Sequence, residues 1–73
     1  MMTLAELLDK LDVNLDKIDI SGKRKMLLRC DYATYIQTPE RMSYLNNVVL
    51  RWYLDCYHNK VTLFVTVDRQ KRG

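Results

Sequence analysis

In two runs between Val48 and Val67, apolar side chains recur at every second position. The first run of this alternation consists of Val48, Leu50, Trp52, Leu54 and Cys56, and the second consists of Val61, Leu63, Val65 and Val67. A period of two predicts strands with one buried face. His58-Asn59 lies between the runs and provides a turn. We therefore predict a hairpin whose core face carries Trp52 and Cys56.

The first of these runs also fits a helix. A continuous helical stripe could be formed by Met42, Leu45, Val49, Trp52 and Cys56. The segment is rich in β-branched and aromatic residues, which have low helix propensity and favour strands. We therefore prefer a strand over residues 48–57, and a helix from Pro39 to Tyr57 would contradict this prediction.

The first eleven residues have a helical pattern instead. Thr3 and Glu6 have the spacing of a capping box, in which each side chain accepts a hydrogen bond from the other residue's backbone amide. One face of the helix is formed by Leu4, Leu7, Leu8 and Leu11. This amphipathic helix is expected to pack on the protein's own sheet, or alternatively in a groove of a partner.

Residues 15–33 return to an alternating pattern, which predicts strands near 17–21 and 25–33. Ser21-Gly22 is a turn signal, and we expect Gly22 to adopt the positive φ of a tight hairpin turn. Thr38-Pro39-Glu40 has the residue order of a helix start, so a second short helix is expected over residues 39–46. Asn46-Asn47 is expected to end it in a left-handed conformation.

The element order is therefore helix, hairpin, helix, hairpin. It predicts an α+β fold with a small four-stranded antiparallel sheet that carries both helices on one face. The 73-residue length allows one domain, residues 1–73, in which residues 69–73 form a flexible basic tail. A composition of 48% hydrophobic and 29% charged residues is typical of a packed chain rather than a disordered one.

The sequence offers little support for catalysis or for a bound cofactor. Its one histidine, His58, falls in a predicted turn, and Cys30 and Cys56 are the only thiols. Gly22 and Gly73 are the only glycines, so there is no phosphate-binding loop. We expect a noncatalytic protein with no metal, no cofactor and no small-molecule substrate.

The two cysteines favour a reduced, cytoplasmic protein. No signal peptide is recognisable, and Cys30 and Cys56 lie in apolar patterns that predict buried thiols. A Cys30–Cys56 disulfide is the alternative and would require an oxidising compartment. Apolar runs such as Val48-Val49-Leu50 are far shorter than the roughly 18 residues of a membrane span, so no membrane association is expected.

Charge is unevenly distributed along the chain, although the net charge is only +3. Residues 1–19 hold five acidic and two basic side chains, whereas basic residues crowd the next segment and the end of the chain. Such an arrangement suits a partner with patches of both signs. The expected partner-binding residues are Lys23, Arg24, Lys25, Arg29, Arg51, Arg69, Lys71 and Arg72.

The start Met1-Met2-Thr3-Leu4-Ala5-Glu6, the basic ending Arg69-Gln70-Lys71-Arg72-Gly73 and the overall size resemble small bacteriophage proteins that bind host RNA polymerase. The resemblance implies a noncatalytic regulator of transcription in the host cytoplasm. Such a regulator blocks promoter-specific initiation and can also make elongating polymerase read through terminators.

Two other functions remain open at this point. The basic clusters and nearby tyrosines could make nucleic-acid contacts, as in a small nucleic-acid-binding module. The chain could also be a phage inhibitor of another host machine, such as a defence nuclease. Basic clusters in turns and tails can also serve only to increase solubility.

Overall fold

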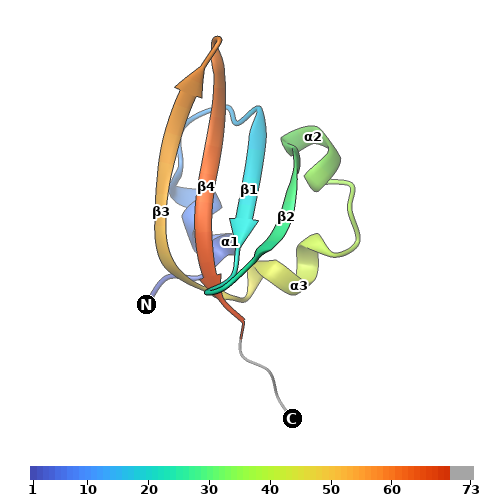
Figure 1. The fold of residues 1–73 in the computed structure, drawn as a ribbon, viewed down its shortest axis with the longest axis vertical. Helices are drawn as coiled ribbons and strands as arrows, with labels where there is room; N and C mark the ends of the chain where they lie inside the picture. The colour runs from blue at the N-terminus through green and yellow to red at the C-terminus, as the bar shows by residue number, and fades with distance from the viewer. Residues whose placement is uncertain (70–73) are drawn as a thin grey trace.

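The computed structural model describes residues 1–69 and contains a four-stranded sheet with three short helices (Figure 1). The helices are α1 (Leu4–Lys10), α2 (Tyr32–Tyr35) and α3 (Arg41–Leu45). The strands are β1 (Lys17–Ser21), β2 (Met26–Asp31), β3 (Val48–Tyr57) and β4 (Lys60–Asp68). The α+β class and four strands are confirmed. Lys71 and Arg72 of the predicted tail lie outside the described residues.

The N-terminal helix begins at the predicted capping box. The Thr3 hydroxyl accepts a hydrogen bond from the Glu6 amide at 3.3 Å, and the Glu6 carboxylate accepts one from the Thr3 amide at 2.9 Å. These bonds satisfy amides that a helix start leaves without partners. The bond from the Thr3 amide is the largest cause of a lowered pKa of the Glu6 carboxyl, and the Thr3 hydroxyl, which donates to Glu6 Oε1 at 3.2 Å, is the next.

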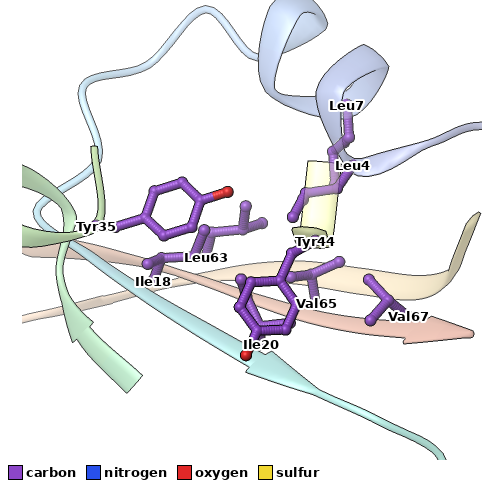
Figure 2. Packing of buried hydrophobic residues seen from close by; sticks show 9 residues of the cluster. All are labelled: Leu4, Leu7, Ile18, Ile20, Tyr35, Tyr44, Leu63, Val65 and Val67. Atoms are coloured by element: carbon purple, nitrogen blue, oxygen red, sulfur yellow. The ribbon is translucent and has the colours of Figure 1, made fainter. Parts of the chain in front are cut away.

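The core lies between the helices and one face of the sheet (Figure 2). The helices contribute Leu4, Leu7, Tyr35 and Tyr44. The two central strands contribute Ile18, Ile20, Leu63, Val65 and Val67. Alternation along β1 and β4 directs these side chains to a single face. Within residues 1–69, no helix covers the other face of the sheet (Figure 1).

The sheet is mixed, which corrects the prediction of a purely antiparallel sheet. Its strand order is β2-β1-β4-β3, and β1 runs parallel to β4. Both hairpins are antiparallel as predicted. The chain leaves β2 at one end of the sheet and enters β3 at the other, so residues 32–47 carry it back along the sheet and form α2 and α3 on the way (Figure 1). β2 and β3 run in the same direction at opposite edges of the sheet, and successive strands with the same direction need a long connection of this kind.

Two turn predictions were wrong. No glycine has positive φ in the described residues, and the β1–β2 connection is a four-residue loop in which the Gly22 amide donates to the Lys25 carbonyl at 2.7 Å. A loop of this length does not require the left-handed conformation at Gly22. Asn46 ends α3 with φ −89° rather than in the left-handed region. The predicted turn at His58-Asn59 is confirmed, since these residues have φ of 51° and 63°.

The segment between the hairpins also differs in detail. β2 ends at Asp31 rather than at residue 33, because the chain enters the unpredicted helical turn α2. The second predicted helix begins at Arg41 rather than at Pro39. Thr38 does not cap it, since its hydroxyl donates to the Thr34 carbonyl at 2.8 Å.

Strand β3 is confirmed, but its side chains are not buried as predicted. Trp52 is 40% exposed, and Cys56 is exposed as well. The buried side chains of the sheet belong to β1 and β4, while β3 is an outer strand and its hairpin projects beyond the rest of the sheet (Figure 1). Replacement of a core tryptophan by alanine typically lowers the free energy of unfolding by about 3–5 kcal/mol. Because Trp52 is partly exposed, Trp52→Ala is not expected to cost this much.

Candidate partner-binding surface

The sheet face opposite the helices is the candidate binding surface, here named the open face. Strand pairing arranges its residues in rows that cross the sheet in the order β2, β1, β4, β3. The central row consists of Arg29, Asp19, Phe64 and Tyr53. A row nearer the C-terminal end of β4 contains Ser21, Thr66 and Arg51, and a row nearer the start of β4 contains Asp31, Lys17, Thr62 and Asp55.

Two aromatic rings occupy the middle of the open face. The rings of Tyr53 and Phe64 are stacked with centroids 4.8 Å apart and planes 12° from parallel. Tyr53 is 59% exposed. A hollow beside this pair is lined partly by Asp19, Ser21 and Arg51. Exposed aromatic rings next to an arginine are typical of surfaces that bind other macromolecules.

A buried carboxylate lies in the same row. Asp19 is only 4% exposed, and Arg29 Nε donates to its Oδ2 at 2.9 Å. Ser21 Oγ donates to the other carboxylate oxygen at 3.4 Å. A buried charge requires such partners. Arg29 is therefore partly committed to Asp19, although most of its side chain remains exposed.

The structure brings the middle and C-terminal basic segments to one end of the sheet. Lys23, Arg24 and Lys25 form the exposed β1–β2 loop, and Lys23 Nζ lies 3.6 Å from Asp68 Oδ1 at the end of β4. The next residue, Arg69, places its guanidinium 4.8 Å from the centre of the Tyr44 ring. We name Lys23, Arg24, Lys25 and Arg69 the basic end.

The other predicted binding residues are distributed differently. Arg51 lies on the open face in the row with Ser21 and Thr66, adjacent to the basic end. Arg29 lies one row further away. Sequence reasoning missed the Tyr53–Phe64 stack and Asp19. A two-residue turn at His58-Asn59 fixes the hairpin register, so the Tyr53–Phe64 pair was recoverable from the sequence.

The cysteines and the histidine do not form a shared site. Cys30 lies on β2 and Cys56 on β3, the two outer strands of the sheet, so they are too far apart for the alternative disulfide, and both thiols are free. Cys30 packs against the core, and burial raises the pKa of its thiol, with a smaller contribution from the charge of Asp31. The His58 and Tyr57 rings meet edge to face, with their centroids 4.0 Å apart.

Within residues 1–69, no three histidine, cysteine or acidic side chains gather into a group that could hold a metal ion. None of the helices in this part of the chain is long and apolar enough to cross a membrane. In comparisons with known proteins, no family model, no curated protein and no solved structure matches this chain.

Proposed function

We propose that this chain is a noncatalytic domain that binds another protein through the open face and the adjoining basic end. The observation that carries the proposal is the mixture of groups on one continuous surface. Stacked aromatic rings occupy its centre, Arg51 and the basic end lie on one side, and Asp31 and Asp55 lie on the other. A partner protein that matches this surface would carry an apolar patch and patches of charge opposite to those of this chain.

The partner we propose is bacterial RNA polymerase, with regulation of transcription as the outcome. The resemblance of the chain's size, termini and charge layout to phage regulators of this enzyme supports that choice. The basic end would contact an acidic region of the polymerase, and the aromatic pair would supply apolar contact area. Electrostatic attraction of this kind raises the association rate and fixes the orientation of binding.

The direct test is binding of the full chain to purified RNA polymerase, combined with in vitro transcription from a promoter through a terminator. We expect binding, fewer initiated transcripts and a changed fraction of read-through. Tyr53→Ala should weaken binding by about tenfold or more, because central aromatic anchors typically contribute 2 kcal/mol or more. Met42→Ala is the matched control, since Met42 is an exposed apolar residue of α3 away from the open face.

These experiments test the identity of the partner and the location of the binding surface separately. If the parent chain does not bind polymerase, the proposed partner is wrong. If it binds and both variants bind equally well, the open face is not the binding surface. A His58→Ala variant should keep all activity, and loss of activity with binding retained would contradict the noncatalytic proposal.

A nucleic-acid-binding function is the second candidate, and the Tyr53–Phe64 stack beside Arg51 favours it. Bases can stack on such rings while an arginine contacts the phosphates. Asp31 and Asp55, two carboxylates on the same face, oppose a phosphate backbone, so we rank it lower. Fluorescence anisotropy with single-stranded RNA and duplex DNA at physiological salt distinguishes nucleic-acid binding from protein binding. Submicromolar binding that Tyr53→Ala abolishes would favour this function over protein binding.

A further inference from the structure

Strand β3 leaves a long backbone edge without a partner in the described part of the chain. It is the outermost strand on its side of the sheet. The N-terminal segment covers only its start, where Thr3 bridges Val48 and the Val49 amide donates to the Met2 carbonyl at 2.7 Å. Residues 50–57 remain unpaired on that side. Unpaired amides and carbonyls on an edge strand are a template for pairing with another strand.

This edge lacks most of the features that usually prevent such pairing. Natural sheets protect their edges with lysine, proline, bulges or very short strands. Residues 50–57 contain no lysine and no proline, and the only irregularity of β3 lies at Leu50. Apolar side chains along it are partly exposed, with Leu50 at 46%, Trp52 at 40% and Leu54 at 37%. The opposite edge, β2, has only six residues and follows the basic β1–β2 loop.

The hairpin turn determines which residues can pair outward. A two-residue turn closes on a pair that exchanges hydrogen bonds, here Tyr57 and Lys60, and bonded pairs then recur at every second residue. Odd-numbered residues from Arg51 to Tyr57 therefore direct their backbone groups towards β4. Trp52, Leu54 and Cys56 direct theirs to the open edge, so an added strand must bond to these even-numbered residues.

The charges on β3 are self-complementary in one of the registers that satisfy this rule. Arg51 and Asp55 are equally spaced on either side of Tyr53 and lie on the same face. An antiparallel copy centred on Tyr53 places Arg51 opposite Asp55 of the second copy, and Asp55 opposite the second copy's Arg51. A slip of two residues in either direction places Arg51 opposite a tyrosine instead. Opposite charges facing each other stabilise a strand pair, whereas like charges destabilise it.

We propose that two copies of this chain pair through β3, antiparallel and in this register, to form a symmetric dimer with one continuous eight-stranded sheet. The second copy is the occupant because the arrangement of charge is complementary to itself, as a two-fold interface requires. Trp52 then exchanges backbone bonds with Leu54 of the second copy, and their side chains meet on the helix side of the sheet. The two open faces become one surface. The dimer is independent of the identity of the proposed partner.

The test is a charge swap followed by sedimentation of the full chain at micromolar to millimolar concentration. The parent should sediment as a dimer. Arg51→Asp places aspartates opposite each other, and Asp55→Arg places arginines opposite each other, so each variant alone should dimerise about tenfold or more weakly. The double variant should dimerise like the parent. A mixture of the two single variants should form a heterodimer, because both cross-strand pairs are then complementary.

Disulfide trapping tests the register independently. In a background in which Cys30 and Cys56 are replaced by serine, a single cysteine should cross-link two copies at position 53, where the residue faces itself in a closely spaced pair. Cysteine at position 52 or 54 should cross-link poorly and would report a slipped register. A parent that stays monomeric at millimolar concentration, or single charge variants that dimerise like the parent while folded by circular dichroism, would overturn the proposal.

Discussion

The hydroxyl of Tyr35 is buried in the core and has no hydrogen-bond partner among residues 1–69. Burial raises its pKa to about 12, with the neighbouring hydroxyl of Tyr32 as the next cause. A buried polar group without a partner destabilises a fold by about 1–3 kcal/mol. The ring of Tyr35 is part of the core and fills the space between α2 and the sheet (Figure 2).

Tyr35→Phe removes this hydroxyl and keeps the ring. We expect the free energy of unfolding at neutral pH to be unchanged or to rise by up to about 2 kcal/mol. Because the folded state holds the phenol proton more tightly, the parent should lose stability as the pH rises from about 10 to about 12. Denaturant titrations across this range should show a smaller loss for Tyr35→Phe. A lower stability than the parent at pH 7 would indicate an important contact of the hydroxyl.

At the scale of single residues, the sequence shows which residues carry charge but not which of them form ion pairs within the fold. Arg29 was selected because it belongs to a basic cluster, yet its guanidinium pairs with Asp19. Asp19 lies ten residues earlier and is brought opposite Arg29 by the β1–β2 register. On the side away from Arg29, it is flanked by Phe64 of β4, from the other end of the chain. That contact has no local signal in the sequence.

At the scale of elements, local chemistry accounts for the parts that were predicted correctly. The capping box, the alternation and the His58-Asn59 turn are each decided within a few residues, so α1, β3 and β4 were found with nearly correct bounds. The parallel β1–β4 pairing could not be inferred, because each hairpin is consistent with either strand as its inner neighbour. α2 was missed because it is a single turn with little amphipathic pattern.

Thr3→Ala tests whether the capping box holds α1 in place. The change removes the hydroxyl that accepts from the Glu6 amide, and loss of such a cap typically costs about 1 kcal/mol. The pKa of Glu6 should rise towards its ordinary value, because part of the hydrogen bonding that lowers it is lost. The part of this contribution that comes from the Glu6 carboxylate should disappear as the pH falls through the pKa of Glu6 in the folded parent. Thermal unfolding and NMR titration measure both effects, and Thr3→Ser is the control that should retain them.

At the scale of the whole molecule, the fold concentrates charges that are separate in the sequence. The β1–β2 loop and the end of β4 are more than forty residues apart in the chain, yet Lys23 and Asp68 are in contact and Arg69 packs on Tyr44 of α3. The row of the open face that contains Asp31, Lys17 and Asp55 lies towards the opposite end of β4. The molecule therefore presents a gradient of charge along the strands, with the aromatic pair between its two ends.

If this gradient orients a protein partner, reversal of charge at the basic end should weaken binding most at low salt. We compare Lys25→Glu in one variant against Lys10→Glu in another, which changes the net charge equally but on α1, away from the open face. Both should fold, because both side chains are exposed. The first should slow association with RNA polymerase about tenfold and reduce its salt dependence, and the second should do neither. Equal effects of the two variants would mean that only net charge matters and would remove the basic end from the binding surface.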